Sequence, residues 1–480
     1  MDQRQNVIWI MTDQHARFAT GCYGSAVAHT PRIDGLAREG IRFDCAFTPS
    51  PVCVPARDAT LSGQYPHTLG YGCDGNFFPS TAFRTGAHAF RENGYTTAFI
   101  GKLHPVIPYT RGFDYYVDLG HYYDYLGPEL KRFILAHQAQ DSGSGCPWMS
   151  PYWYEPHAWT ETGPAHVNGG IKAYSAVLDA PDLLPEEDQF EAFVVRNAKA
   201  FLDRHETDPF FLCVNFVKPH FPYASPQRHH DRFRPEDMQL PDNAGAWAST
   251  PECNRRWVQQ DLTDSELRRK AQQLMADYYA AVSHADECVG QILDELQRRG
   301  IADDTIVVYT TDHGEMLGEH GIWEKQKFYE ASARVPLIVR WPKRFAGGKV
   351  VQENVNLCDL FATLCELCDI PCPSGLDSRS LVPLMEGDVA GWDNETVSQF
   401  GPHNVMIKQG DLKYQYYGPD MPEVLFDLAR DPREREDVIS DPGYSEQVAR
   451  FRRRLAQLGH GPNADTAYTN AGYPVRPSRD

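Results

Sequence analysis

The sequence predicts an α/β fold in which a doubly wound, mixed but mainly parallel sheet is flanked by helices. Short, nearly continuous apolar runs recur along the first three quarters of the 480-residue chain, as is typical of strands buried on both faces. Amphipathic segments of helical length lie between these runs. Polar residues follow two of the runs directly, at the carboxyl ends where an open parallel sheet forms its ligand crevice.

The individual elements follow in chain order. We expect buried strands at Asn6–Met11, Thr96–Ile100, Phe210–Val217, Thr305–Thr311 and Pro336–Arg340. We expect helices at Thr30–Glu39, which opens with Thr-Pro, and at Phe190–His205, Ser265–Arg299 and Val355–Leu367. An alternation of buried strands and helices is typical of a doubly wound sheet.

The pattern changes after about Gly375. Short strands split by turn residues are expected at Val397–Phe400, Val405–Lys408, Lys413–Tyr417 and Val424–Phe426, followed by a helix at Ser445–Leu458 and a polar tail from Gly461. We therefore predict an N-terminal α/β domain over residues 1–375. A smaller C-terminal α+β subdomain, with an antiparallel sheet and one helix, would occupy residues 376–480.

The net charge of −19 limits the partners of this chain. An acidic surface repels nucleic-acid phosphates, so no nucleic-acid partner is expected. An anionic ligand is still compatible with this charge, but only where Lys, Arg, His or a metal ion concentrates positive charge locally.

The N-terminus and the cysteines indicate the compartment. The first residues contain no positively charged segment followed by a long apolar stretch, so no secretory signal is expected. No run of about 18 apolar residues occurs, so no membrane span is expected either. The twelve cysteines are scattered through a large chain and are interpreted as free thiols. We therefore expect a cytoplasmic protein.

Acidic residues follow two of the predicted strands. Asp13 and Gln14 come after the first strand, and Asp312 and His313 come directly after Thr305–Thr311. Because the carboxyl ends of parallel strands share one edge of a sheet, these distant residues can meet and hold a divalent cation. Alternatively, the two aspartates only cap the helices that follow them.

A second cluster surrounds Cys53. The cysteine precedes a predicted helix start, with Pro55 two residues on and Arg57 one turn later. A helix start and a nearby arginine lower the pKa of a thiol. A buried structural cysteine near a helix cap is the alternative, but the C-x-P-x-R spacing is unusual for one.

This C-x-P-x-R spacing, followed by Thr60–Gly63, resembles the signature of the sulfatase family within the alkaline phosphatase-like superfamily. In that family a dedicated enzyme oxidises the cysteine to formylglycine. Further segments resemble the family's motifs in order along nearly the whole chain. They are Gly101–His104, Lys218–Pro222, Thr311–Glu315, Gly318–Lys325, Phe328–Glu330, Arg334–Pro336 and Leu425–Leu428 with Asp431-Pro432.

The resemblance implies a sulfuric-ester hydrolase of the arylsulfatase type. A sulfate ester resists attack because its oxygens surround the sulfur with negative charge, so the enzyme must neutralise that charge and hold a strong nucleophile in line. Hydrated formylglycine at position 53 would attack sulfur with one hydroxyl. Its second hydroxyl would then expel sulfate and restore the aldehyde.

The resemblance also implies a role for each matching residue. Asp13, Gln14, Asp312 and His313 would hold one divalent cation together with residue 53. The expected ion is Ca²⁺, and Mn²⁺ or Zn²⁺ are alternatives.

The remaining matches surround the nucleophile and the sulfate. Arg57 and His104 would orient the hydrated aldehyde, and His104 would take a proton in the elimination step. Lys102 and Lys325 would bind sulfate oxygens as point charges. His220 would donate a proton to the leaving alkoxide.

Three positions depart from the most familiar sulfatases, which carry Asp at Gln14, Asn at His313 and often Ser at Ala56. The first departure lowers the negative charge of the cation site and the second adds a nitrogen ligand, so both weaken a strict preference for calcium. A histidine at the second place also occurs in relatives that cleave phosphonate monoesters and phosphodiesters. Hydrolysis of these esters is therefore the alternative activity. A non-catalytic anion-binding protein would need neither Cys53 nor its oxidation motif.

The expected partners are a small-molecule or saccharide sulfate ester and a formylglycine-generating enzyme, and the sequence permits a homo-oligomer. Ten aromatic residues between Tyr115 and Trp159 either line the mouth of the site or pack a long surface excursion. Cys358, Cys365, Cys368 and Cys372 lack paired zinc-ligand spacing and are interpreted as structural thiols.

Overall fold

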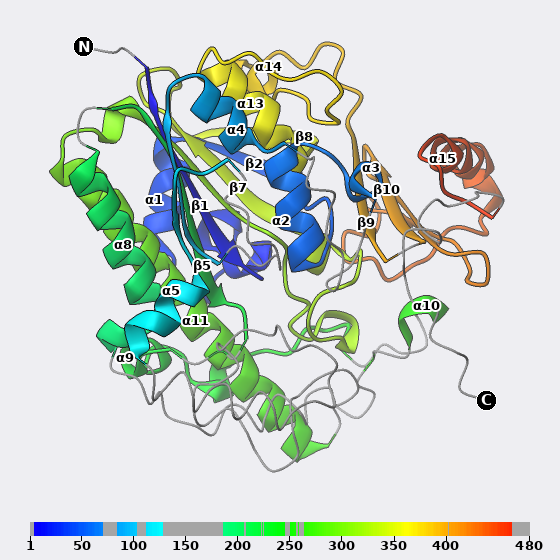
Figure 1. The fold of residues 1–480 in the computed structure, drawn as a ribbon. Helices are drawn as coiled ribbons and strands as arrows, with labels where there is room; N and C mark the ends of the chain where they lie inside the picture. The colour runs from blue at the N-terminus through cyan, green and yellow to red at the C-terminus, as the bar shows by residue number, and fades with distance from the viewer. Residues whose placement is uncertain are drawn as a thin grey trace.

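An eight-stranded sheet forms the centre of the fold (Figure 1). The structure, a computed structural model, describes residues 4–70, 84–102, 112–127, 186–205, 208–221, 223, 225–244, 250–255, 258, 264–401 and 403–462. From one edge to the other the strands are β4 (Tyr115–Val117), β3 (Thr96–Gly101), β5 (Phe210–Pro219), β1 (Asn6–Asp13), β6 (Thr305–Thr311), β7 (Arg334–Arg340), β2 (Ile41–Phe47) and β8 (Lys349–Asn356).

All strands of this sheet run parallel except one. β7 is antiparallel to both of its neighbours, β6 and β2, and the other pairs are parallel. The predicted mixed, mainly parallel sheet is therefore confirmed. Because only β7 is reversed, the carboxyl ends of the other strands share one edge of the sheet.

The apolar run of β1 explains its central place. Ile8 and Ile10 pack on one face against α1 (Pro31–Glu39), α8 (Phe190–Arg204) and α11 (Ser265–Arg298). Trp9 and Met11 point to the other face, where α2 (Cys53–Ser62), α4 (Gly86–Glu92), α13 (Leu360–Leu367) and α14 (Val382–Glu386) cover the sheet. Figure 1 shows these two helical layers on opposite sides of the strands. A strand buried on both faces is apolar at successive positions, as this one is.

A second, antiparallel sheet follows, in the order β12 (Val424–Asp427), β11 (Leu412–Tyr417), β10 (Asn404–Gln409) and β9 (Glu395–Phe400). The helix α15 (Ser445–Gln457) packs on it through Val448, Phe451 and Leu455. The predicted small antiparallel sheet with one helix is confirmed. The division of the chain at residue 375 stays a prediction.

Shorter helices complete the described fold. They are α3 (Pro66–Leu69), α5 (Leu119–Leu126), α9 (Gln227–His230), α10 (Glu252–Arg255) and α12 (Glu330–Ala333). Among the described residues, no helix combines the length and apolar character needed to cross a membrane.

One predicted boundary is wrong. The helix expected at Val355–Leu367 begins only at Leu360, because Val355 and Asn356 still belong to strand β8. Asn356 ends the strand, since its side chain accepts a hydrogen bond from the backbone N–H of Cys358. Asp359 in turn accepts from the backbone N–H of Asn356, and this reciprocal cap starts a 3-10 turn that leads into the helix.

Two buried histidines between α9 and α11 give the fold a dependence on pH. The rings of His229 and His284 lie 5.1 Å apart. Burial, together with nearby cationic side chains, lowers the pKa of His229 to about 4 and holds the pKa of His284 well below its usual value. Both are therefore neutral in the folded chain, whereas an unfolded histidine binds a proton near pH 6.5.

The free energy of unfolding should therefore fall as the pH drops from about 7 toward about 4. In His284→Phe, which keeps a ring but cannot be protonated, the midpoint of thermal unfolding should decrease less between pH 7.5 and 5.5 than in the parent chain. Substitution of the exposed His121 by Gln is the control and should leave the slope unchanged. An unchanged slope in His284→Phe would contradict the assignment.

Candidate active site

Four neighbouring parallel strands bring polar residues to one edge of the sheet. Asp13 is the last residue of β1, and Asp312 directly follows β6. Lys102 directly follows β3, and His220 directly follows β5. Since these strands are adjacent in the order β3-β5-β1-β6, residues that are about 300 positions apart in the sequence meet at the carboxyl edge.

The helix α2 adds the cysteine and the arginine. Cys53 is its first residue and is 1% exposed, so the thiol lies where unpaired backbone N–H groups give a helix its positive end. Arg57, one turn later, donates from Nε to Asp312 Oδ2 at 2.8 Å and from Nη2 to Asp13 Oδ2 at 2.9 Å. One buried guanidinium thus fixes the carboxylates of two strands.

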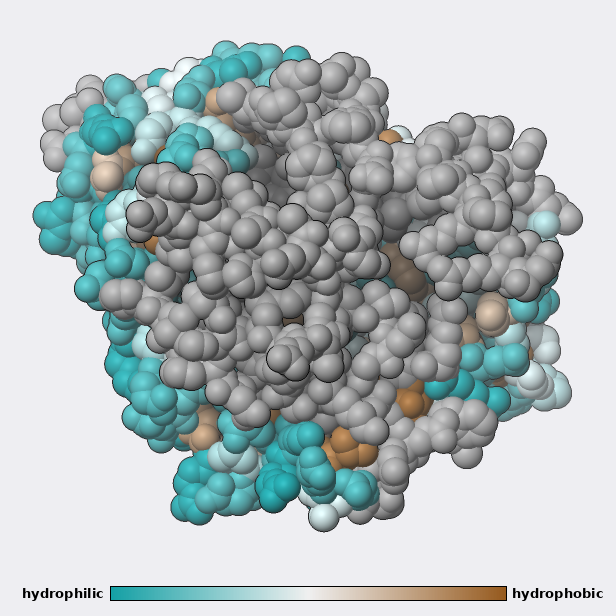
Figure 2. Space-filling model, turned by 60° about the horizontal axis from the view of Figure 1, so that its bottom comes forward, coloured by the Kyte–Doolittle hydropathy of each residue, from teal (hydrophilic) through white to brown (hydrophobic). Residues whose placement is uncertain are grey.

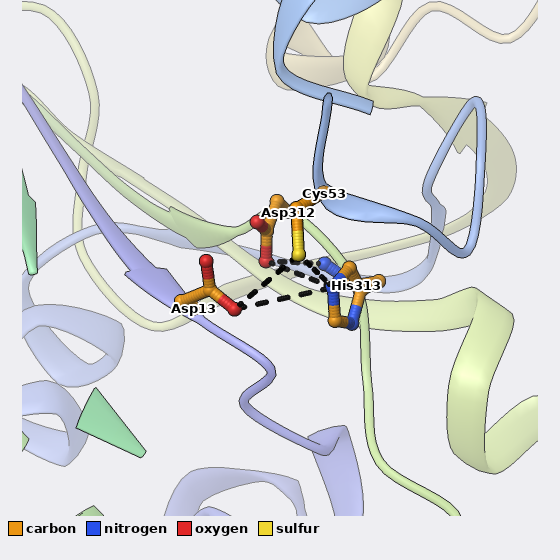
Figure 3. Close-up of side chains that lie close together, drawn as sticks. All are labelled: Asp13, Cys53, Asp312 and His313. Atoms are coloured by element: carbon orange, nitrogen blue, oxygen red, sulfur yellow. Dashed lines mark hydrogen bonds and ion pairs between the residues drawn. The ribbon is translucent and has the colours of Figure 1, made fainter. Parts of the chain in front are cut away.

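Asp13, Cys53, Asp312 and His313 form a compact group of candidate ligands (Figure 3). One donor atom from each lies within 4.8 Å of all the others, and all four side chains are buried. His313 Nδ1 faces the carbonyl oxygen of Gly314 at 2.9 Å, which leaves Nε2 turned toward the carboxylates and 3.1 Å from Cys53 Sγ. Two carboxylates and a correctly oriented imidazole fit a divalent cation.

Gln14 borders this group. Its amide oxygen accepts a hydrogen bond from Lys325 Nζ at 2.8 Å, and its amide nitrogen donates to Glu315 Oε2. The backbone of Gln14 adopts a left-handed conformation with φ 63°. The hydroxyl of Tyr278 stabilises this turn, since it donates to the carbonyl of Gln14 and accepts from the N–H of Ala16, each at 2.7 Å.

Two lysines flank the carboxylates and the cysteine. Lys102 Nζ lies 2.6 Å from Asp13 Oδ2. Lys325 Nζ lies 3.4 Å from Cys53 Sγ and 2.7 Å from His220 Nε2. Both lysines are at least nine-tenths buried, so they concentrate positive charge at this edge of an acidic protein. The local cluster that the net charge requires for an anionic ligand is present.

The charges of the group shift its protonation. Burial alone would raise the pKa of Asp13, but Lys102, His220 and Arg57 together hold it well below its usual value. Burial and the Asp13 charge oppose ionisation of Cys53, yet Lys325 and Lys102 lower its pKa on balance. Burial would also lower the pKa of His313, but Asp312 and Cys53 raise it to about 9. A cation bound here would displace that proton.

His220 is held in one tautomer. Its Nδ1 lies 2.6 Å from the carbonyl oxygen of Phe221 and is therefore the protonated nitrogen. Burial, with Lys325 and Lys102 nearby, holds the pKa of His220 well below its usual value. The imidazole is thus neutral, and its Nε2 accepts from the ammonium of Lys325.

The structure brings together nine of the ten predicted site residues, and His104 lies outside the described residues. Of the predicted aromatic stretch, two described rings pack against α8, whereas Tyr125 is 44% exposed. Tyr115 contacts Phe201, and Tyr122 contacts Phe190 and Phe193. The rest of that stretch, from position 128 onward, also lies outside the described residues.

Three residues at the site were not predicted. The Oδ1 of Asn215 accepts from Arg57 at 3.4 Å, and this residue is the one polar position in the apolar run FFLCVNFV, a signal that could have identified it. Glu315 is the last residue of the segment Thr311–Glu315, but the family resemblance implied no role for it. Tyr278 lies on the long helix α11, where the sequence gives no signal for its contact with Gln14.

The sequence model described as "Sulfatase" matches residues 5–370, and the model "N-sulphoglucosamine sulphohydrolase, C-terminal" matches residues 318–461. A choline-sulfatase of Rhizobium meliloti is 30% identical to this chain, and the match covers 92% of this chain and 83% of the choline-sulfatase. An N-acetylglucosamine-6-O-sulfatase of Bacteroides thetaiotaomicron is 27% identical over 93% of this chain and 84% of its own.

A solved structure with the same fold is the phosphonate monoester hydrolase of Agrobacterium radiobacter. Its TM-score is 0.76 at 24% identity, with 95% of each chain covered. At this identity the likeness shows the fold alone. The matched family model covers most of the chain and includes every residue of the site described above. The chain therefore belongs to the sulfatase family and is a sulfuric-ester hydrolase.

Proposed function

We propose that this enzyme hydrolyses sulfate monoesters of small molecules or saccharides with residue 53 as the nucleophile. The thiol would first be oxidised to formylglycine by a formylglycine-generating enzyme. The observation that carries the proposal is the place of Cys53, buried at the start of α2, 3.1 Å from His313 Nε2 and 3.4 Å from Lys325 Nζ. A buried thiol with candidate metal ligands on one side and an ammonium on the other supports the proposal of a nucleophile at this position.

Asp13, Asp312, His313 and Gln14 would hold one divalent cation beside residue 53, with Ca²⁺ as the expected ion and Mn²⁺ or Zn²⁺ as alternatives. When bound, the cation would lower the pKa of a hydroxyl of the hydrated aldehyde and neutralise sulfate charge.

The basic side chains divide the remaining tasks. Arg57 donates from Nε to Asp312, from Nη1 to the Lys102 carbonyl and from Nη2 to Asp13. It would therefore fulfil its proposed role of orienting the hydrated aldehyde through the carboxylates that it holds. Lys102 and Lys325 supply ammonium groups for the sulfate oxygens. His104 keeps its proposed role of orienting the hydrated aldehyde and accepting its proton.

Proton delivery to the leaving alkoxide would involve His220 and Lys325 as a pair. Since Nδ1 of His220 donates to Phe221, its Nε2 is an acceptor and can pass on a proton that it receives from Lys325 Nζ, 2.7 Å away. The pair would therefore protonate the leaving oxygen from Nε2 and keep the imidazole neutral before and after the step.

The proposal covers a broad range of leaving groups. The two relatives described above are named for choline and for N-acetylglucosamine-6-O-sulfate, which are a small molecule and a saccharide. Hydrolysis of phosphonate monoesters or phosphodiesters is the second candidate, because the site combines Gln14 with His313. The cytoplasmic location stays a prediction.

Oxidation of Cys53 is tested by peptide mass. In protein made together with a formylglycine-generating enzyme, the peptide that contains residue 53 should be lighter by the difference between a thiol and an aldehyde, or its hydrate. Cys45, eight residues earlier, should stay a thiol and is the internal control. Fully active protein with an unmodified Cys53 would contradict the mechanism, as would sustained turnover by Cys53→Ser.

Cation binding is tested by removal. A chelator should abolish hydrolysis of an aryl sulfate, and Ca²⁺ or Mn²⁺ should restore it. His313→Ala should retain less metal after dialysis and lose roughly 10²–10³-fold in kcat/KM, as is typical when one stabilising group is removed. His67→Ala is the matched control, because His67 lies on α3 and contacts Gln399 and none of the described site residues. Full activity in metal-free protein would overturn the proposed cation.

A substrate panel separates the two activities. The kcat/KM for an aryl sulfate should exceed the values for an aryl phosphonate and a phosphodiester under each metal tested, because the chain belongs to the sulfatase family. Lys102→Ala should reduce kcat/KM for the sulfate by roughly 10²-fold. Lys270→Ala, which changes a half-buried lysine paired with Glu266 on α11, should not. A dominant phosphonate activity would replace the proposed function by the alternative.

A further inference from the structure

We propose that Glu315 is a positioning residue that fixes the amide of Gln14 with its oxygen toward the cation site. The inference rests on the proposed function, because Gln14 is one of the four residues proposed to hold the cation. It explains why an amide stands at position 14, where a carboxylate would otherwise serve a cation equally well.

Glu315 is itself fixed by the backbone. It is 0% exposed, and its Oε1 accepts from the N–H of Leu317 at 2.9 Å and from the N–H of Glu324 at 2.7 Å. Leu317 and Glu324 stand at the two ends of the turn that leads to Lys325, so the carboxylate of Glu315 links these two ends. Its Oε2 faces the amide of Gln14, so only a hydrogen-bond donor is favourable at that place.

The amide of Gln14 therefore has one favourable orientation. Its nitrogen donates to Glu315, and its oxygen accepts from Lys325 Nζ at 2.8 Å. A flipped amide would place oxygen against the carboxylate and nitrogen against the ammonium, and both contacts would be repulsive. A carboxylate at position 14 with the same length would likewise face the carboxylate of Glu315.

The backbone of Gln14 is held independently of its side chain. Its N–H donates to Asp312 Oδ1 at 3.1 Å, and its carbonyl accepts from Tyr278. The choice between amide and carboxylate at position 14 therefore depends on the side-chain contacts alone. Residues 14 and 315 are therefore a coupled pair, in which the hydrogen-bond donor and the acceptor can be exchanged between the two positions.

The test is a double-mutant cycle in the full-length, matured enzyme with Glu315→Gln, Gln14→Glu and the combined variant. Glu315→Gln is isosteric and keeps an oxygen for the N–H groups of Leu317 and Glu324, but it presents a donor to Gln14. The combined variant restores one donor and one acceptor with the polarity reversed. Glu319→Gln, in the same turn but bonded to Arg433, is the matched control.

Each variant is measured for Ca²⁺ retained per chain after dialysis, for kcat/KM with an aryl sulfate, and for its thermal midpoint with and without Ca²⁺. Each single variant should lose roughly tenfold or more in Ca²⁺ affinity and in kcat/KM. The combined variant should recover most of that loss. This recovery is expected even if Glu315→Gln alone folds poorly, because the second substitution restores the hydrogen bond between the two side chains. A merely structural glutamate would shift the midpoint without this recovery of cation binding.

Two results would overturn the inference. One is parental Ca²⁺ affinity in Glu315→Gln, and the other is a combined variant as impaired as the worse single variant. Absence of sulfate hydrolysis by the parent enzyme is a separate result, since it would remove the proposed function while the Ca²⁺ measurements still decide the coupling.

Discussion

The bridge from Arg57 to Asp13 and Asp312 is the interaction on which the site depends. Two carboxylates end neighbouring strands, and both are 0% exposed, where an unpaired charge costs several kcal/mol. The guanidinium offers planar, directed N–H groups that contact both at 2.8–2.9 Å. Because Arg57 belongs to the helix that begins with Cys53, the same bridge sets the distance between Cys53 and the strands.

The site reconciles an acidic protein with an anionic substrate. The chain carries a net charge of −19, yet Arg57, Lys102 and Lys325 lie together with Asp13 and Asp312 at one edge of the sheet. Little of this charge is exposed, so bulk salt screens it weakly. The surface keeps other polyanions away, while the interior of the site favours a small anion that can enter it. The positive charge that an anionic ester requires is thus concentrated inside the site and not on the surface.

The sequence predicted the central strands well because they are apolar on both faces, which leaves a continuous run. It did not predict β2 and β8, whose polar and apolar residues alternate irregularly near the edge of the sheet. At the site, the order of the motifs identified most residues. The partners of Gln14 could not be predicted, since they depend on a backbone turned to φ 63°. That turn directs the carbonyl to Tyr278 and the amide to Glu315.

The strand order also constrains how the enzyme can be made. β1 leaves the ribosome first but lies between β5 and β6, so its second neighbour exists only after Thr311 has been translated. At roughly 5–20 residues per second, this interval lasts on the order of tens of seconds. Throughout it, α2 lacks the partners that bury Cys53 in the folded chain, so an enzyme that oxidises this thiol, as proposed above, would meet it uncovered. Once Lys325 has joined the site, the thiol is 1% exposed, so the proposed oxidation would have to come before this step.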